Sequence, residues 1–193
     1  MVLRPLRRRD RADWQRLRAT NRDWLQEWDA TMPPSGPPWG PTSGAPDEAA
    51  RGYPAMVREL RALARAGRCL PFAVLYERRM VGQLTVSNIV WGSARWGQVG
   101  YWIDQGHAGR GIMTTAVALA IDHCFFGMGL HRIEVAIRPE NTASLRVVEK
   151  LRIGEIGLAP RYLHISGAWR SHRLFAITVE EVPRGLLARL TDT

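Results

Sequence analysis

Three consecutive β-like segments, followed by a glycine loop and a helix, constrain the fold of this chain most. From Leu70 the apolar residues recur with a period of two, in PFAVLYE, MVGQLTVSNIV and RWGQVGYWI, with short turns between the segments. The period then becomes helical from about Arg110 to Phe126, and Gly127 and Gly129 end that stretch. This pattern predicts an antiparallel meander that leads directly into a helix opened by glycines.

The remaining segments complete an alternation of strands and helices. We expect a strand at 2–6, a helix from Asp10 or Asp13 to about Trp28, a helix at 55–66, a strand at 131–138, a short helix at 141–151 and a closing hairpin that turns at Ser166-Gly167. The expected order is β-α-α-β-β-β-α-β-α-β-β, with no internal repeat. The chain of 193 residues is therefore predicted to form one α/β (α+β) domain spanning 1–193.

Residues 31–54 interrupt this alternation with a Pro/Gly-rich loop. They hold seven of the twelve prolines, which argues against regular structure there. The loop is either a linker or an ordered segment beside a binding cleft.

The charge and the cysteine content narrow the classes of partner. The net charge is +9, and Lys150 is the only lysine among the 27 basic residues. Such a charge suits nucleic acid, a ribosome-like surface or a small polyanion as the partner, although an arginine-rich codon bias explains part of the charge.

The cysteines and the lack of targeting segments indicate the compartment. Two cysteines far apart make no disulfide framework, and neither a secretion signal nor a membrane span is apparent, so a cytoplasmic protein without a membrane partner is expected. The five histidines show no metal-binding spacing, so no metal is expected.

The glycine loop, A-G-R-G-I-M at 108–113, has the chemistry of an anion site. It lacks both the G-x-G-x-x-G of dinucleotide-binding folds and the Gly-Lys-Ser/Thr of a P-loop. Backbone N–H groups at a helix start, with no bulky side chain nearby, can bind a pyrophosphate. The alternative is a plain loop with a glycine at the helix start.

Four motifs in order resemble the GCN5-related N-acetyltransferase (GNAT) family. Gly111 matches the central glycine of the family's Gln/Arg-x-x-Gly-x-Gly/Ala loop, whereas Ala108 and Met113 depart from it. The segments L-R-P-L-R-R-R-D near the N-terminus, R-I-E-V-A-I-R-P-E-N-T-A-S at 132–144 and Y-L-x-x-x-G-x-W-R-x-H from Tyr162 to His172 are similar to the Rim-type branch, the ribosomal-protein alanine N-acetyltransferases. The resemblance implies a mixed, mostly antiparallel twisted sheet of about seven strands, splayed around acetyl-CoA and flanked by about four helices.

The resemblance also implies where the co-substrate acetyl-CoA binds. The backbone of Tyr101, Trp102 and Ile103 would pair with the pantetheine arm like an added strand. Asn141 and Ser144 would contact the pantetheine or the thiol end, and Asn141 is equally a helix cap. The pyrophosphate would bind to Gly109, Arg110, Gly111, Ile112, Met113 and Thr114.

The acid and base of acetyl transfer are less clear from the sequence. The positions of the family's usual Glu/Tyr dyad hold Ala136 and Val148. Glu134 shares the strand face of Ala136 and is a candidate base, or an ion-pair partner of a neighbouring arginine. Ser144 is a candidate hydrogen-bond donor to the departing thiolate, or a first-turn helix residue. Transfer with water as the base, aided mainly by proximity, is a further alternative.

The leading functional hypothesis is acetyl transfer from acetyl-CoA to a primary amine, the N-terminal α-amine of a ribosomal or other protein. A small amine such as an antibiotic, a polyamine or an amino acid is the second candidate acceptor. A third hypothesis is a non-catalytic acyl-CoA-binding, ribosome-associated protein, and a homodimer is a candidate assembly.

Overall fold

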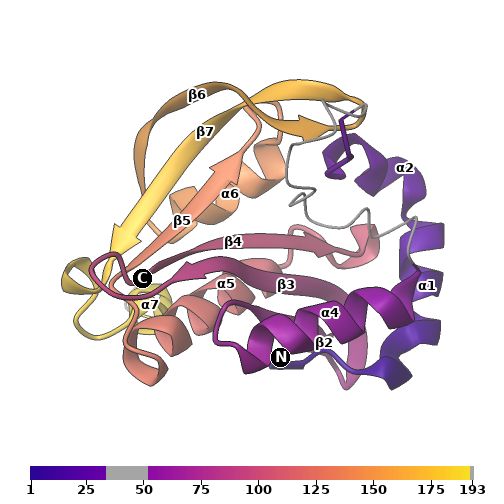
Figure 1. Cartoon of the computed structure of the whole chain (residues 1–193), viewed down its shortest axis with the longest axis horizontal. Coiled ribbons are helices and arrows are strands. Elements are labelled where there is room, and N and C mark those ends of the chain that lie inside the picture. The colour runs from indigo at the N-terminus through magenta and orange to yellow at the C-terminus, as the bar shows by residue number, and fades with distance from the viewer. Residues whose placement is uncertain (34–51, 192–193) are drawn as a thin grey trace.

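The fold is a single mixed sheet, described here from a computed structural model that covers residues 1–33 and 52–191. Seven strands lie in the order β1-β2-β3-β4-β5-β7-β6. Figure 1 shows β4, β5, β7 and β6 following one another across the sheet. Every pair of neighbours is antiparallel except β4 and β5, which are parallel. The strands are β1 (Val2–Pro5), β2 (Leu70–Tyr76), β3 (Arg79–Val90), β4 (Trp96–Ile103), β5 (Arg132–Ile137), β6 (Gly154–Ile165) and β7 (Ala168–Thr178). The expected α/β fold with a mostly antiparallel, seven-stranded sheet is confirmed.

The described residues contain six α-helices, where about four were expected. They are α1 (Arg11–Thr20), α2 (Arg22–Leu25), α4 (Tyr53–Arg65), α5 (Ile112–Asp122), α6 (Thr142–Lys150) and α7 (Leu186–Thr191). Short 3-10 turns lie at Arg8–Asp10, Gln26–Trp28, Gln105–His107 and Val179–Glu181, and a π-turn at His123–Gly127 extends α5. The helix α7 was not expected, and α1 and α2 replace the single helix expected up to Trp28.

The break between α1 and α2 has a local cause at Asn21. Its side-chain amide donates to the Leu17 carbonyl at 2.9 Å and to the Asp104 carboxylate at 2.7 Å, while its oxygen accepts from the Gln105 amide at 2.8 Å. A short amide side chain that bonds its own helix and a second loop competes with helical backbone bonding. The helix therefore turns at Asn21, and the second segment is directed across the end of β4.

The Pro/Gly-rich loop expected at 31–54 is shorter than predicted at its C-terminal end. Tyr53 and Pro54 form the first turn of α4, and Gly52 precedes them with φ 69°. Proline in a first helical turn loses no hydrogen bond, so the sequence cue for a loop was misleading there. At the other end, Thr31 donates its amide to the His164 carbonyl at 3.0 Å. Residues 34–51 lie outside the described residues.

The core consists of two clusters on opposite faces of the sheet, and the larger one extends from β2 to β7. The helix predicted around residues 110–126 buries its expected inward residues Ile112, Ala116, Val117, Ala120, Ile121 and Cys124. On the opposite face, Trp14 of α1 and Tyr53, Met56 and Val57 of α4 pack around Ala73 of β2. No helix in the described part of the chain combines the length and apolar character that crossing a membrane requires.

A gap opens in the middle of the sheet, between β4 and β5. The two strands pair only where Trp96–Gln98 faces Arg132–Glu134. Beyond that point β5 continues against β7, and β4 continues against β3, so the two strands diverge (Figure 1). The edge of β4 from residue 99 to 103 is therefore left without a neighbouring strand on the β5 side, as the resemblance implied.

Candidate functional site

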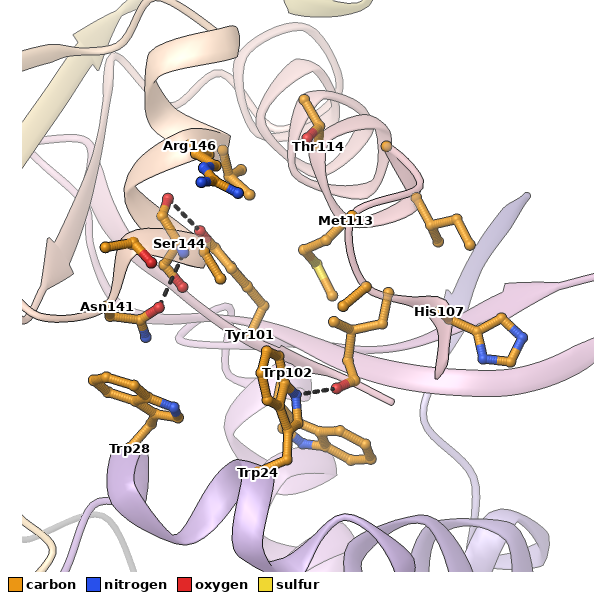
Figure 2. Close-up of a pocket in the computed structure, with 18 of the residues that line it drawn as sticks. Trp24, Trp28, Tyr101, Trp102, His107, Met113, Thr114, Asn141, Ser144 and Arg146 are labelled. Atoms are coloured by element: carbon orange, nitrogen blue, oxygen red, sulfur yellow. Dashed lines mark hydrogen bonds between the residues drawn. The ribbon is translucent and has the colours of Figure 1, made fainter. Parts of the chain in front are cut away.

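A cavity of about 510 Å³ lies beside the end of β4, beyond the point where β5 has diverged from it. Its walls come from α2 and the turn after it, the end of β4, the glycine loop with the start of α5, and the first turns of α6. Figure 2 shows Trp24 and Trp28 on one side of this cavity and Ser144, Arg146 and Thr114 on the other. Elements that are far apart in sequence thus build one cleft at the end of the sheet.

The glycine loop presents backbone donors to this cleft. Gly109 and Gly111 have φ angles of 74° and 77°, which only glycine adopts without strain. The Thr115 amide is the first at the start of α5 to bond an earlier carbonyl, that of Gly111 at 3.0 Å. The amides of 109–114 make no hydrogen bond within the described residues. Space in front of both glycines is open, so an anion can reach these amides.

The side chain of Arg110 does not line the cleft. Its guanidinium lies 5.0 Å from the centre of the Tyr76 ring, and one of its nitrogens is 3.4 Å from the Tyr76 hydroxyl. Two other cations line the cavity instead, Arg146 and Lys150, one helical turn apart on α6. The sequence pattern did not single them out, although their i, i+4 spacing after Asn141 is the available signal. Donors of α5 and cations of α6 therefore face one cavity, which suits a polyanion.

Successive residues at the end of β4 direct their backbone N–H and C=O groups alternately toward β3 and toward the gap. Asp104 donates its amide to the Val81 carbonyl at 2.8 Å, and a side-chain carbon on Gly82 would collide with the Trp102 carbonyl. Trp102 therefore directs its backbone toward β3, whereas Tyr101 and Ile103 face the gap. The Ile103 carbonyl accepts the Trp24 indole N–H at 3.1 Å. Of the three residues expected to pair with a pantetheine arm, Tyr101 has the freest gap-facing backbone.

Asn141 and Ser144 lie together at the start of α6. The Asn141 side-chain oxygen accepts the Ser144 amide at 3.0 Å, which makes Asn141 the helix cap (Figure 2). The Tyr101 hydroxyl lies 3.5 Å from the Ser144 carbonyl, and burial raises the pKa of Tyr101 to about 12. The phenol is therefore protonated at neutral pH.

A second cavity, of about 210 Å³, adjoins the first. Trp28, Tyr101, Asn141 and Ser144 line both cavities. The second cavity extends between the strands along β5 to Leu163 and Ile165 of β6 and to His172 of β7. Two compartments of different size thus meet at Tyr101 and Ser144, as a site for two substrates requires.

Glu134 lies outside both cavities among the described residues. Its carboxylate accepts from the Arg132 guanidinium at 2.7 Å, the ion pair that the sequence left open as the alternative to catalysis. Ala136, two residues along the same strand face, does line the second cavity. A role for Glu134 as a base stays a prediction.

Comparison with known proteins agrees with this geometry. Residues 1–153 match the family model for an acetyltransferase (GNAT) domain. The chain is similar to the [ribosomal protein uS5]-alanine N-acetyltransferase of Escherichia coli, with 30% identity over 75% of each chain. It is also 38% identical to the probable N-acetyltransferase YjcK of Bacillus subtilis, over 51% of this chain and only 55% of that protein.

Solved structures extend the similarity to nearly the whole chain. Mycobacterium smegmatis RimJ in complex with CoA-disulfide superposes with a TM-score of 0.87 and 40% identity, covering 98% of this chain and 87% of that one. A ribosomal-protein-S5-alanine acetyltransferase from Vibrio fischeri superposes with a TM-score of 0.77 and 29% identity, covering 91% of both chains. RimL, a ribosomal L7/L12 α-N-protein acetyltransferase, shares the fold at 20% identity.

The residues present fit acetyl-CoA. Unpaired amides at the start of α5 and the cations Arg146 and Lys150 suit the phosphates, and the gap-facing backbone of Tyr101 suits an amide-bearing arm. No group of three or more metal-ligating side chains occurs within 1–33 and 52–191.

Proposed function

We propose that this chain, which belongs to the GNAT acetyltransferase family and is an N-acetyltransferase, acetylates the N-terminal α-amine of a protein. Its acetyl donor is acetyl-CoA, and the substrate class that we propose is ribosomal proteins. The similarity to RimJ and to the uS5-alanine N-acetyltransferases favours this acceptor over a free small amine. The net charge of +9 also suits an acidic or ribosomal target.

The observation that carries the proposal is the junction of the two cavities at Tyr101, Asn141 and Ser144. The larger cavity, with the amides of 109–114, would hold the donor and end with the thioester at this junction. The smaller cavity would receive the amine from the opposite side. Apolar walls from Trp28, Leu163 and Ile165 suit the small side chain of a first residue such as alanine.

Acetyl transfer at the junction requires an uncharged amine and a stabilised leaving group. The amine nitrogen attacks the thioester carbonyl carbon, the carbon–sulfur bond breaks, and the sulfur leaves as a thiolate. Ser144 lines both cavities, and its hydroxyl would donate a hydrogen bond to the departing sulfur while keeping its proton. Holding both substrates at the junction lowers the activation free energy by several kcal/mol through proximity alone. The largest effects of this kind reach about 7–11 kcal/mol.

Glu134 is the candidate base that the sequence offers, and because its carboxylate is paired with Arg132 it would act through a water. On that hypothesis Glu134→Gln lowers the rate at neutral pH more than at high pH. An equal loss at every pH would mark Glu134 as a structural residue of β5.

A thiol-release assay over a panel of acceptors tests the proposed function. The panel contains peptides that differ only in their first residue, alongside polyamines, aminoglycosides and free amino acids. We expect turnover on peptides with a small first residue and at most weak turnover on the free amines. Activity confined to free amines would assign the protein to small-molecule acetylation, and binding without turnover on any amine would indicate a non-catalytic protein.

The proposal includes the cytoplasm as the location, because ribosomal proteins are made there, and a homodimer as a candidate assembly. Sedimentation of the purified chain with and without acetyl-CoA tests the second point directly.

A further inference from the structure

His172 of β7 is a buried histidine with a fixed tautomer at the second cavity. Only 3% of the residue is exposed, yet it lines the cavity where the acceptor would bind. Its Nδ1 lies 3.0 Å from the Arg170 carbonyl. A carbonyl only accepts, so Nδ1 carries the hydrogen and Nε2 keeps its lone pair. Within the described residues Nε2 makes no hydrogen bond and is not among the fully buried unpaired atoms, so a proton acceptor without a partner is accessible from the cavity.

The strand register places His172 of β7 beside the C-terminal end of β5. Ala136 faces Leu174, and Ile137, the last residue of β5, faces Arg173, which is next to His172 in β7. Ala136 and His172 are therefore diagonal neighbours on one sheet face, at about 7–8 Å. Ala136 and His172 both line the second cavity, together with Val99, Gly100 and Tyr101 of β4.

Of the titratable side chains that line the second cavity, His172 alone is suited to act as a base. The titratable side chains that line the second cavity are Tyr101, Arg138 and His172. Burial raises the pKa of Tyr101 to about 12, and a guanidinium stays charged in proteins, so neither accepts a proton at neutral pH. Glu134 lies outside the cavity and is paired with Arg132. His172 is thus the one group among the described lining residues that can take a proton from an amine.

We propose that His172 is the general base of this acetyltransferase, with Nε2 removing a proton from the acceptor ammonium. The inference deepens the proposed function, since it assigns a catalytic residue to the acceptor side of the same site. It requires that an amine enters the second cavity, and it does not depend on whether that amine belongs to a peptide.

The charges around His172 favour its neutral form. Arg138 and Glu140, which follow β5, both act on it electrostatically, and the Tyr162 ring of β6 lies 5.9 Å away in an edge-to-face contact. Burial lowers the pKa of His172 below its ordinary value of 6.5, and the positive charge of Arg138 lowers this pKa further. The hydrogen bond to Arg170 and the negative charge of Glu140 act in the opposite direction but do not outweigh burial. The imidazole is therefore an unprotonated base at pH 7.

The step balances in atoms and charge. One proton passes from the ammonium nitrogen to Nε2, and the lone pair that is freed attacks the thioester carbonyl carbon. When the carbon–sulfur bond breaks, its electron pair leaves on sulfur. The remaining surplus proton on nitrogen passes to that thiolate, so the products are the amide, the free thiol and one proton on His172, which returns to solvent.

The substitution His172→Asn tests the assignment, because an asparagine amide can keep the hydrogen bond to the Arg170 carbonyl but cannot take up a proton. We expect kcat to fall about 100-fold at pH 7, at the lower end of general-base effects. The loss should shrink by at least tenfold at pH 9.5, where the free acceptor amine is already uncharged. The KM for acetyl-CoA should stay within twofold. The matched control is His131→Asn, since His131 pairs with Glu180 at the surface and lies outside both cavities.

A second variant separates chemistry from folding. In His172→Ala the imidazole is removed entirely, and added imidazole should restore activity in a concentration-dependent way. The proposal is overturned if His172→Asn behaves like His131→Asn, if its loss is equal at every pH and imidazole rescues nothing, or if Glu134→Gln shows the larger pH-dependent loss. If the wild-type protein acetylates small amines and not peptides, the peptide proposal fails while the same pH comparison on the small amine still decides the role of His172.

Discussion

The guanidinium of Arg138 lies 5.0 Å from the centre of the Trp28 ring and donates to the Glu27 carbonyl at 2.8 Å. These contacts join the end of β5 to the turn Gln26–Trp28, which follows α2 in the chain. Trp28 lines both cavities, and Arg138 lines the acceptor cavity. A single buried arginine therefore fixes one aromatic wall of the acceptor side relative to the sheet.

Replacing Arg138 with methionine should loosen this wall. The change removes a charged hydrogen bond and a cation–π contact, so the free energy of unfolding should fall by about 2 kcal/mol, as urea denaturation can measure. The KM for the peptide should rise several-fold, while the affinity for acetyl-CoA stays unchanged. Arg173→Met is the control, because Arg173 also lies over an aromatic ring, Phe175 at 5.3 Å, but lines neither cavity. Equal peptide KM values for the two variants would contradict this role for Arg138.

A bulky residue in the glycine loop should block the donor. Gly111→Trp places an indole in front of the amides of 109–114, and we expect acetyl-CoA binding to be abolished in calorimetric titration. Gly129→Trp has the same kind of backbone, with φ 74° against 77° at Gly111, and the space in front of both glycines is open. Both variants pay a similar backbone penalty, of about 1–2 kcal/mol, but only the first should lose acetyl-CoA. Unchanged affinity in Gly111→Trp would mean that the pyrophosphate binds elsewhere.

Asp10 should make the stability of the N-terminal segment depend on pH. Its carboxylate accepts two bonds of 2.7 Å from Arg4 and one of 2.8 Å from the Arg7 amide. Burial alone would raise the pKa of Asp10, but these hydrogen bonds outweigh burial and lower it below the ordinary 3.8. The stabilisation is thus present above the ordinary pKa and is lost as pH falls through the lowered one.

The Asp10→Asn variant measures that contribution. Removing one partner of a buried, charge-assisted pair should cost about 2–3 kcal/mol at pH 7, and the difference from wild type should vanish as the pH falls to about 2. Parallel urea titrations at the two pH values give both numbers. A difference that does not change with pH would show that the carboxylate charge contributes nothing.

Ser144→Ala tests the leaving-group contact without disturbing the helix cap. The cap uses the Ser144 backbone amide and the Asn141 oxygen, so the hydroxyl can be removed while the cap stays. We expect kcat to fall about 10–100-fold with little change in stability, since losing one oxyanion-type donor costs up to about 100–1,000-fold. A loss of stability with an unchanged kcat would identify the hydroxyl as a structural group.

Local patterns predicted the framework of this fold because each element carries its own period. The helix around residues 110–126 and the strands from Leu70 to Ile103 follow directly from the spacing of their apolar residues. The gap between β4 and β5 could be expected from the family resemblance alone, since it depends on β5 losing its pairing with β4 after Glu134 while it stays paired with β7. Asn21 broke a predicted helix through a bond to Asp104, a partner 83 positions away.

The acceptor side of the site was harder to predict for the same reason. Arg138 and His172 are adjacent only through the pairing of β5 with β7, and Trp28 reaches them from the N-terminal segment. Glu134 is the nearest carboxylate to Ala136 in sequence, yet its side chain is taken by Arg132 two residues before it. His164 is also buried, with its Nδ1 3.1 Å from the Thr31 carbonyl, but of the two only His172 lines the second cavity, and that position is not visible in the order of residues.

The position of the acetyl group on a peptide that offers two amines tests the central claim most directly. A peptide with a free α-amine on a small first residue and one internal lysine is incubated with acetyl-CoA, and tandem mass spectrometry locates the added acetyl group. The account predicts modification of the α-amine with the lysine left free, and loss of that product in Gly111→Trp. Acetylation of the lysine alone, or α-amine acetylation that persists in Gly111→Trp, would contradict it.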